Sequence, residues 1–469
     1  MAKESEFVCQ ACGATSAKWV GRCPGCGGWN TLVEERVPKG SRARARGAMS
    51  VSATGSKVVR LEEAVAQEAP RVPCGMREVD RVLGGGLVEG SVVLLGGEPG
   101  VGKSTLLLQM VAQLVTQPEA SPRMRGGVLY VSGEESAAQV AGRARRLGVR
   151  EGDQLRLLAS GDLDDVERAI AEINPSVVAI DSVQTLRASE LESAAGSVSQ
   201  LREVTSRLVT LAKQEARTMV LVGHVTKDGS LAGPKVLEHL VDVVVAFDGT
   251  RSGGPRLLRS IKNRFGAAGE LAVMEMTRDG LQEVEDPSKL FLAERPKDVP
   301  GSVVLASADG PRPLLLEVQA LVTPSAMPSP RRVATGVDAT RLSILTAVLS
   351  QRANLSIRDR DVFVSLAGGA SVDEPAADLG VACAIASSVV ELSLPMDLVV
   401  FGEIGLAGEV RAVPRCTPRL EEAVKQGFKR AIVPRANVER GEVPPGMVAH
   451  GVAHAREVAA WIERKRDAR

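Results

Sequence analysis

The residues with the clearest chemical signature form a glycine-rich segment near position 100. Residues 96–105 read GGEPGVGKST and match the P-loop pattern GxxxxGK[ST], with Gly97, Gly102, Lys103 and Ser104 in its defining positions. In such a loop the backbone N–H groups turn toward phosphate oxygens, and the N-terminus of the following helix favours the anion. Lys103 is predicted to reach the β and γ phosphates, and the Ser104 hydroxyl to ligate Mg²⁺. The segment therefore predicts a site for a nucleoside triphosphate.

The flanking residues supply the strand and the helix that this loop needs. The apolar run SVVLL at 91–95 predicts a buried strand before the loop. The run KSTLLLQMVAQLV at 103–115 predicts a helix after it. A chance glycine-rich turn is the alternative, and it would not be expected to carry both flanks.

Acidic residues follow two further apolar strands, at spacings that suit ATP hydrolysis. GGVLYVSGEES at 126–136 contains Glu134, the better candidate for the base that orients the attacking water, and Glu135, which suits a helix N-terminal acid. SVVAIDS at 176–182 places Asp181 after four apolar residues, where it is expected to hold Mg²⁺ through water. The predicted ATP and Mg²⁺ ligands are Gly97, Glu98, Pro99, Gly100, Val101, Gly102, Lys103, Ser104, Thr105 and Asp181.

Another apolar run, TMVLVGHVTKDG at 218–229, predicts a buried strand that ends in polar residues. His224, Thr226 and Lys227 follow its apolar part and are candidates to sense the γ phosphate. For His224, a hydrogen-bonded structural histidine is the alternative.

Four cysteines in two close pairs form a second signature near the N-terminus. Cys9 and Cys12, then Cys23 and Cys26, can hold one Zn²⁺ tetrahedrally with each thiolate at about 2.3 Å. A module this small lacks its own hydrophobic core, so the metal would supply the folding free energy. Redox-active or unpaired thiols are the alternatives. Whether the ribbon touches DNA or another protein stays open.

Composition bounds the remaining possibilities. The 469 residues suffice for two to three domains, and the net charge of +1 means that any basic surface must be local. Aromatic residues are only 2%, so a nucleic-acid site built mainly on base stacking is hard to assemble. Residues 36–60 carry seven basic residues and no acidic one, which fits a flexible tether or an arm on phosphate backbone. Without an apolar signal core or a membrane-length apolar run, we expect a cytoplasmic protein.

The order of these motifs, followed by KNRFG at 262–266, resembles the bacterial RadA (Sms) family over essentially the whole chain. That resemblance implies a RecA-like ATPase acting as a ring-shaped, DnaB-type helicase that promotes branch migration in recombinational repair. It implies a homo-hexamer on single-stranded and branched DNA, with a strand-exchange recombinase as a further possible partner. It assigns Glu134 as the catalytic glutamate and places Lys262 and Arg264 against the neighbouring subunit's nucleotide. The motif residues are Lys262, Asn263, Arg264, Phe265 and Gly266.

The resemblance also implies two mobile DNA-binding loops, at about 187–199 and 227–238. Both are rich in Gly, Ser and Ala. Their basic residues are few: Arg187 in the first loop, and Lys227 and Lys235 in the second. We expect a weak, sequence-independent grip from each subunit, multiplied around the ring.

The residues from about 286 onward resemble the proteolytic domain of Lon. Alignment to that domain puts Ala376 at the position of its serine nucleophile and Thr417 at that of its lysine. We therefore expect no peptidase activity and a scaffold role in ring assembly. Six basic residues could face DNA or form a solvated helix face: Arg411, Arg415, Arg419, Lys425, Lys429 and Arg430.

Together these features predict an α/β chain with four parts. They are a zinc ribbon at 1–35, a basic linker at 36–58, a RecA-like ATPase domain at 59–285 and a Lon-like α/β domain at 286–469. The expected activity is a DNA-dependent ATPase and helicase using ATP, Mg²⁺ and Zn²⁺. A nucleotide-gated regulatory scaffold resembling circadian ATPases is the alternative, and an ATP-dependent serine–lysine protease is a weaker one.

Overall fold

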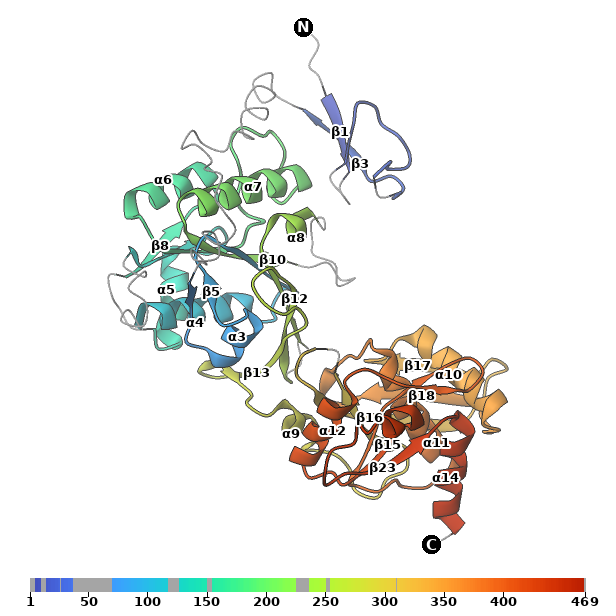
Figure 1. The fold of residues 1–469 in the computed structure, drawn as a ribbon. Coiled ribbons are helices and arrows are strands. Elements are labelled where there is room, and N and C mark those ends of the chain that lie inside the picture. The colour runs from blue at the N-terminus through green and yellow to red at the C-terminus, as the bar shows by residue number, and fades with distance from the viewer. Residues whose placement is uncertain are drawn as a thin grey trace. The chain divides into compact units, whose positions relative to one another are not determined.

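The chain folds into two compact units, Met1–Glu283 and Val284–Arg469 (Figure 1). The computed structural model describes residues 5–9, 14–25, 27–36, 70–116, 126–149, 154–224, 236–249, 254–308 and 310–467. The predicted linker at 36–58 lies outside these ranges apart from Arg36. Within them, every helix is too short or too polar to cross a membrane.

A small antiparallel sheet forms the N-terminal ribbon. Its strand order is β2 (Thr15–Ser16), β1 (Ser5–Cys9), β3 (Leu32–Arg36). Among the described residues of the ribbon, Cys9, Cys23 and Leu32 form the buried cluster. A cluster this small is not a stable hydrophobic core, which fits a module that is cross-linked by a metal.

A nine-stranded sheet forms the centre of the ATPase domain. From one edge to the other its strands are β14 (Gly280–Glu283), β13 (Leu271–Thr277), β12 (Arg256–Asn263), β11 (Val243–Gly249), β6 (Val92–Gly97), β10 (Thr218–His224), β9 (Val177–Asp181), β7 (Val128–Ser132) and β8 (Leu155–Ala159). The run from β11 to β8 is parallel, and β12 to β14 are antiparallel additions. A short pair, β4 (Arg71–Val72) and β5 (Leu87–Val88), stands outside it.

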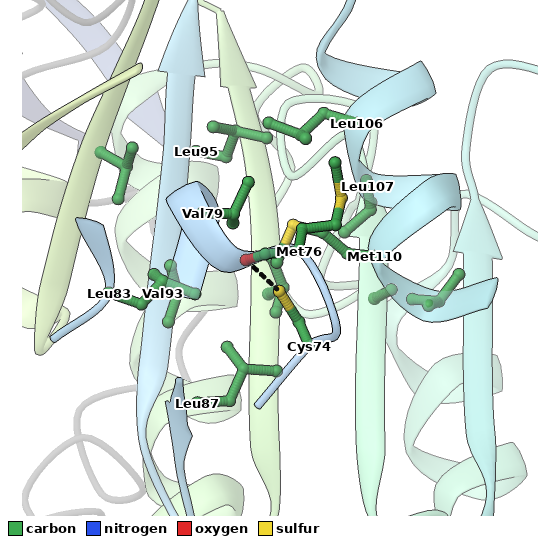
Figure 2. Packing of buried hydrophobic residues seen from close by; sticks show 14 of the residues in the cluster. Cys74, Met76, Val79, Leu83, Leu87, Val93, Leu95, Leu106, Leu107 and Met110 are labelled. Atoms are coloured by element: carbon green, nitrogen blue, oxygen red, sulfur yellow. Dashed lines mark hydrogen bonds between the residues drawn. The ribbon is translucent and has the colours of Figure 1, made fainter. Parts of the chain in front are cut away.

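Helices cover both faces of this sheet. They are α3 (Arg77–Val82), α4 (Lys103–Thr116), α5 (Ala137–Arg146), α6 (Leu163–Ile173), α7 (Val198–Gln214) and α8 (Val236–Leu240). Alternate residues of β6 enter different cores, because successive strand side chains point to opposite faces. Val93 and Leu95 pack with α3 and α4, as Figure 2 shows for Leu106, Leu107, Met110 and the buried Cys74. Val92 and Leu94 pack instead with residues of α6 and α7.

The second unit is built on a seven-stranded mixed sheet. Its order is β17 (Arg332–Thr335), β18 (Arg360–Leu366), β16 (Leu314–Pro324), β15 (Ser302–Ser307), β19 (Leu398–Val400), β22 (Arg430–Pro434) and β23 (Val448–Val452). A separate pair joins β20 (Glu403–Ile404) to β21 (Val410–Arg411). Its α-helices are α9 (Pro287–Leu292), α10 (Ala339–Arg352), α11 (Asp378–Val390), α12 (Cys416–Lys425), α13 (Arg435–Glu439) and α14 (Ala455–Asp467). Two 3₁₀ turns are η3 (Ala367–Gly369) and η4 (Pro375–Ala377).

Two of the six basic residues considered for DNA contact are instead structural. Arg419 is 1% exposed and forms a two-pronged ion pair with Glu374, with nitrogen–oxygen distances of 2.8 and 2.5 Å. It also donates to the Ala306 carbonyl (2.7 Å) and stacks over Phe401, 5.5 Å from the ring centroid. Arg415 donates to backbone carbonyls of the segment 308–311. The suggestion that Arg419 faces DNA or solvent is therefore wrong, since its helix turns this side chain into the core.

Replacing Arg419 by Met should destabilise the second unit by about 3–5 kcal/mol, because Glu374 is then left buried without its counter-ion. Burial alone would raise the pKa of Glu374, but the hydrogen bonds and charge of Arg419 outweigh it and lower that pKa. The stabilisation is therefore present at neutral pH and is lost as the pH falls through the lowered pKa. Urea unfolding followed by Trp461 fluorescence measures the free energy of unfolding of the second unit, once Trp19 and Trp29 have been replaced by Phe. A Glu374→Gln/Arg419→Met double variant should recover part of the loss, and equal stability of wild type and Arg419→Met would contradict the assignment.

Candidate nucleotide site

The sheet brings the predicted nucleotide residues to its carboxyl edge, which is the border formed by the carboxyl ends of the parallel strands. Across adjacent parallel strands, Gly97 is level with His224 and Ser132 is level with Asp181. The P-loop, Glu134 and Asp181 therefore all follow the carboxyl ends of neighbouring strands. Crevices at the carboxyl ends of parallel strands are the usual ligand sites of open α/β sheets.

Packing behind the P-loop explains its glycines. A Cβ on Gly97 would lie 2.3 Å from the Phe247 carbonyl oxygen, and one on Gly102 would lie 2.8 Å from Met276 Cε. Gly102 also has a φ of +112°, which side chains disfavour. The buried Arg256 donates from Nε to the Val101 carbonyl (3.2 Å) and supports the loop from β12. Close packing against β11 and β13 thus requires glycine at both positions and fixes the course of the loop, in agreement with the P-loop pattern that binds ATP.

Lys103 lies within this cradle. It is 4% exposed, and its Nζ donates to the Gly97 and Glu98 carbonyls at 2.8 and 2.9 Å. Burial lowers the pKa of the Lys103 ammonium, while the nearby carboxylates of Asp181, Glu134 and Glu98 act in the opposite direction. Lys103, Asp181 and Glu134 are thus brought together as predicted.

A buried tyrosine orients Asp181. Tyr130, the only tyrosine of the chain, is fully buried on β7, and its hydroxyl donates to Asp181 Oδ2 at 2.9 Å. Burial, reinforced by the Asp181 charge, raises the pKa of the Tyr130 phenol far above its usual value, so the hydroxyl remains a donor. This hydrogen bond restricts the orientation of the Asp181 carboxylate. The Asp181 carboxylate and the Ser104 hydroxyl are hard oxygen ligands of the kind that Mg²⁺ prefers.

Glu134 and Glu135 have different neighbours. Ser182, fully buried directly after Asp181, donates from Oγ to Glu134 Oε1 at 2.9 Å, and His224 Nε2 lies 3.4 Å from the same oxygen. Glu135 instead pairs with Arg143 of α5 at 2.5 Å. Glu134 is therefore the carboxylate that remains beside the P-loop. The second ring nitrogen of His224, Nδ1, is buried without a hydrogen-bond partner in the described structure.

The KNRFG motif lies at the amino edge of the sheet, which is formed by the amino ends of the parallel strands and is opposite to the P-loop. Asn263 pairs with Val243, and Val243 is level with Val93, four residues before Gly97 on β6. At about 3.3 Å per residue the two positions differ by ~13 Å along the strand direction. The structure therefore does not bring Lys262 or Arg264 to the nucleotide edge of their own subunit.

Within the chain, both cations of this motif hold the segment between α8 and β11. Lys262 Nζ donates to the Glu238 and Val241 carbonyls at 2.7 and 2.8 Å. Arg264, with a side chain 52% exposed, donates to Asp242 Oδ1 at 3.0 Å. The 2% exposed Asp242 is a hub for further donors.

The Asp242 carboxylate ties the motif to the first residue of the P-loop strand. Its Oδ2 accepts from the Val92 N–H (3.1 Å) and from Lys213 Nζ of α7 (2.6 Å). Burial alone would raise the pKa of Asp242, but these hydrogen bonds and the neighbouring cations lower it, so the group stays ionised.

The first predicted DNA loop is more constrained than its composition suggests. The amide of Gln200, at the start of α7, accepts from the Ala188 N–H (2.8 Å) and donates to the carbonyls of Ala188, Leu191 and Ser193 (3.2, 3.1 and 3.1 Å). Arg187 of this loop is exposed. Residues 227–235 of the second loop, with Lys227 and Lys235, lie outside the described residues, as does Thr226, whereas 236–238 form the start of α8.

The described half of the cysteine set fits a metal site. Cys9 and Cys23 are 0% and 2% exposed and lie in the same small buried cluster. The Gly25 N–H donates to Cys23 Sγ at 3.3 Å, and Cys9 Sγ lies 3.1 Å from Thr31 Oγ1. Hydrogen bonds of this kind stabilise metal-bound thiolates. Cys12 and Cys26 lie outside the described residues.

The positions aligned with the Lon serine and lysine carry no catalytic group. Ala376 is buried in η4, and Thr417 donates from Oγ1 to the Glu442 carbonyl at 3.0 Å. The Glu374–Arg419 pair, described above, lies two residues from each of these positions in sequence. Buried ion pairs thus adjoin the positions that a serine–lysine dyad would need.

These sites define a RecA-like P-loop ATPase joined to a zinc ribbon and a ChlI- and Lon-like domain. Family models agree: an AAA domain matches residues 60–230, a rubredoxin metal binding domain residues 7–34, and subunit ChlI of Mg-chelatase residues 334–437. The AAA domain takes ATP with Mg²⁺, and the ribbon takes Zn²⁺.

Similarity over the full length identifies the family. DNA repair protein RadA of Bacillus subtilis is 47% identical, covering 97% of this chain and 98% of the relative. RadA of Pseudomonas aeruginosa is 49% identical (94% and 95% covered), and RadA of Escherichia coli 47% (96% of each). The chain belongs to the RadA family. A KaiC-like protein from Pyrococcus horikoshii, 21% identical with 46% of this chain and 99% of that one covered, reaches a TM-score of only 0.38, too low to support an argument.

Removing the Tyr130 hydroxyl should weaken the response to Mg²⁺. Because a hydrogen bond to a charged group contributes about 1.5–3 kcal/mol, Tyr130→Phe should raise the Mg²⁺ concentration that half-saturates the nucleotide-bound state by roughly 10- to 100-fold. Binding of a fluorescent ATP analogue, titrated with Mg²⁺, measures this without turnover. Binding of the analogue in EDTA serves as the control and should not change. An unaltered Mg²⁺ titration in the variant would contradict the role of Tyr130.

Proposed function

We propose that this protein is a DNA-dependent ATPase that works as a helicase in recombinational repair, promoting branch migration by translocating on DNA. Its full-length relatives are DNA repair proteins, and its nucleotide edge has the parts for ATP hydrolysis. The observation that carries the proposal is the location of Lys262 and Arg264, at the sheet edge opposite their own P-loop.

Cations at that edge can serve only a nucleotide bound by another subunit. In a closed ring with head-to-tail contacts, one surface of each subunit meets a different surface of the next. Lys262 and Arg264 would then complete the neighbour's site and stabilise the charge that develops in phosphoryl transfer. The homo-hexamer is part of this proposal.

On the nucleotide side, each residue has a proposed role. Lys103 binds the β and γ phosphates, and Glu134, aligned by Ser182, orients the attacking water and takes its proton. Ser104 and Asp181 would hold Mg²⁺, which neutralises phosphate charge when bound. His224, beside Glu134 at the end of β10, is placed to respond to the γ phosphate.

Lys262 also offers a route by which hydrolysis acts on DNA. It binds the Glu238 and Val241 carbonyls, in and just after α8, the helix that contains the end of the second predicted DNA loop at 227–238. A lysine drawn to the neighbour's phosphate must release these carbonyls. Each hydrolysis event would then alter how that loop, with Lys227 and Lys235, grips single-stranded or branched DNA.

The remaining parts are assigned supporting roles. The four cysteines would hold Zn²⁺ in a ribbon at 1–35, followed by the basic linker at 36–58. The Lon-like domain at 286–469 would keep the subunits in register, without peptidase activity, because Ala376 offers no nucleophile. A recombinase partner and a cytoplasmic location belong to the same proposal.

ATPase rates with and without single-stranded DNA, and strand displacement on forked DNA, test the motor. Lys262→Ala should lower the DNA-stimulated rate by about 10³-fold, the scale of a cation supplied in trans, while still binding nucleotide. Lys103→Ala should lose both nucleotide binding and unwinding. Lys297→Ala, an exposed lysine of the second unit, is the control.

Two results would contradict the proposal. Full unwinding by Lys262→Ala would remove the role in trans. A wild-type rate that DNA does not change would favour the nucleotide-gated scaffold over a motor.

A further inference from the structure

The zinc ribbon exposes two large aromatic side chains. Trp19 is 53% exposed and Trp29 is 71% exposed, and they are two of only three tryptophans in the chain. Burying an indole contributes more than burying most other side chains, so leaving two in water on so small a module is costly. Adjacent exposed aromatic side chains of this kind mark a surface for a partner.

Both indoles flank the same backbone position. A Cβ on Gly21 would lie 3.8 Å from Trp19 Cη2 and 3.8 Å from Trp29 Cζ3. The Asn30 N–H donates to the Gly21 carbonyl at 2.9 Å, and Arg22 forms a backbone bridge with Trp29. The two rings are therefore held side by side by the same turns that present the cysteines.

A cation accompanies the rings. The Arg22 guanidinium carbon lies 5.9 Å from the Trp29 ring centroid, and its Nε donates to the Gly27 carbonyl at 3.0 Å. Lys18, next to Trp19, is exposed. We name the surface formed by Lys18, Trp19, Arg22 and Trp29 the ribbon face.

Cations are the only charged side chains of the segment that carries both tryptophans. Between residues 14 and 31 these are Lys18 and Arg22, whereas Glu6, Glu34 and Glu35 of the ribbon lie on strands β1 and β3. The segment that follows, 36–60, adds seven basic residues and no acidic one. Flat aromatic faces beside cations are complementary to unpaired bases on a phosphate backbone.

We propose that the ribbon face binds single-stranded DNA, with bases stacked on Trp19 and Trp29 and phosphates paired with Lys18 and Arg22. The inference rests on the proposed function, since it adds a second DNA contact to the same motor. Single strands fit better than duplex, because a duplex already stacks its bases on one another and presents only edges and phosphates. The ribbon would therefore hold the strand that the ring separates or has yet to take up.

The test uses the full-length protein and an unstructured oligo(dT). With Trp461 replaced by Phe, Trp19 and Trp29 are the only tryptophans left, and oligo(dT) should quench their fluorescence. In anisotropy titrations, Trp19→Ala/Trp29→Ala should bind oligo(dT) roughly 10- to 100-fold more weakly than wild type. Trp19→Phe/Trp29→Phe should keep most of the affinity, since it keeps a ring to stack on. Val33→Ala, which removes another exposed apolar side chain of the ribbon, should bind as wild type.

Zinc content measured for each variant separates loss of the surface from loss of the fold. If the double alanine variant holds its zinc and binds oligo(dT) as tightly as wild type, the proposal is overturned, and a protein partner for the ribbon face is favoured. In that case wild type and variant would both retain DNA-stimulated ATPase activity, so the proposed function would stand. Absence of DNA binding and DNA stimulation in the wild type would instead overturn both.

Discussion

The direction of parallel strand pairing determines where every proposed catalytic group of the ATPase domain lies. Strands β6, β10, β9 and β7 run the same way, so their carboxyl ends bring the P-loop, His224, Asp181 and Glu134 together. Strand β12 runs the other way beside β11, so its own carboxyl end delivers Lys262 and Arg264 to the opposite edge. In the proposed ring, one pairing rule thus places the P-loop half of a shared site at one end of the strands and the Lys262/Arg264 half at the other.

A buried carboxylate links KNRFG to the strand that carries the P-loop. At the amino end of that strand, Asp242 holds both Arg264 and the amide of Val92, the residue at which the strand begins. Because Asp242 is buried and ionised, it cannot lose these donors without a large desolvation cost. A change in what Arg264 binds therefore bears directly on the strand that carries the P-loop. In the proposed ring, this arrangement would give each subunit a physical means of passing the state of its site to the next.

Local sequence patterns predicted much of the fold and the nucleotide site, but they could not predict contacts between residues far apart in the chain. The P-loop, Asp181 and Glu134 could be identified because each depends on an apolar run and a few adjacent residues. The Tyr130–Asp181 and Glu374–Arg419 contacts join residues 51 and 45 positions apart, which no local pattern reveals. For the same reason Arg419 looked like a surface cation. An aromatic content averaged over the chain, 2%, also does not reveal that two exposed tryptophans are concentrated on one small module.

The central claim is that adjacent subunits share one site, and mixing two inactive variants tests it directly. Lys103→Ala lacks a working P-loop but keeps its Lys262, whereas Lys262→Ala has the reverse defect. In rings assembled at random from equal amounts, about a quarter of the head-to-tail interfaces would join an intact P-loop to an intact Lys262. The account predicts that DNA-stimulated ATPase activity reappears in the mixture. Activity no greater than the sum of the two variants assayed separately would contradict it.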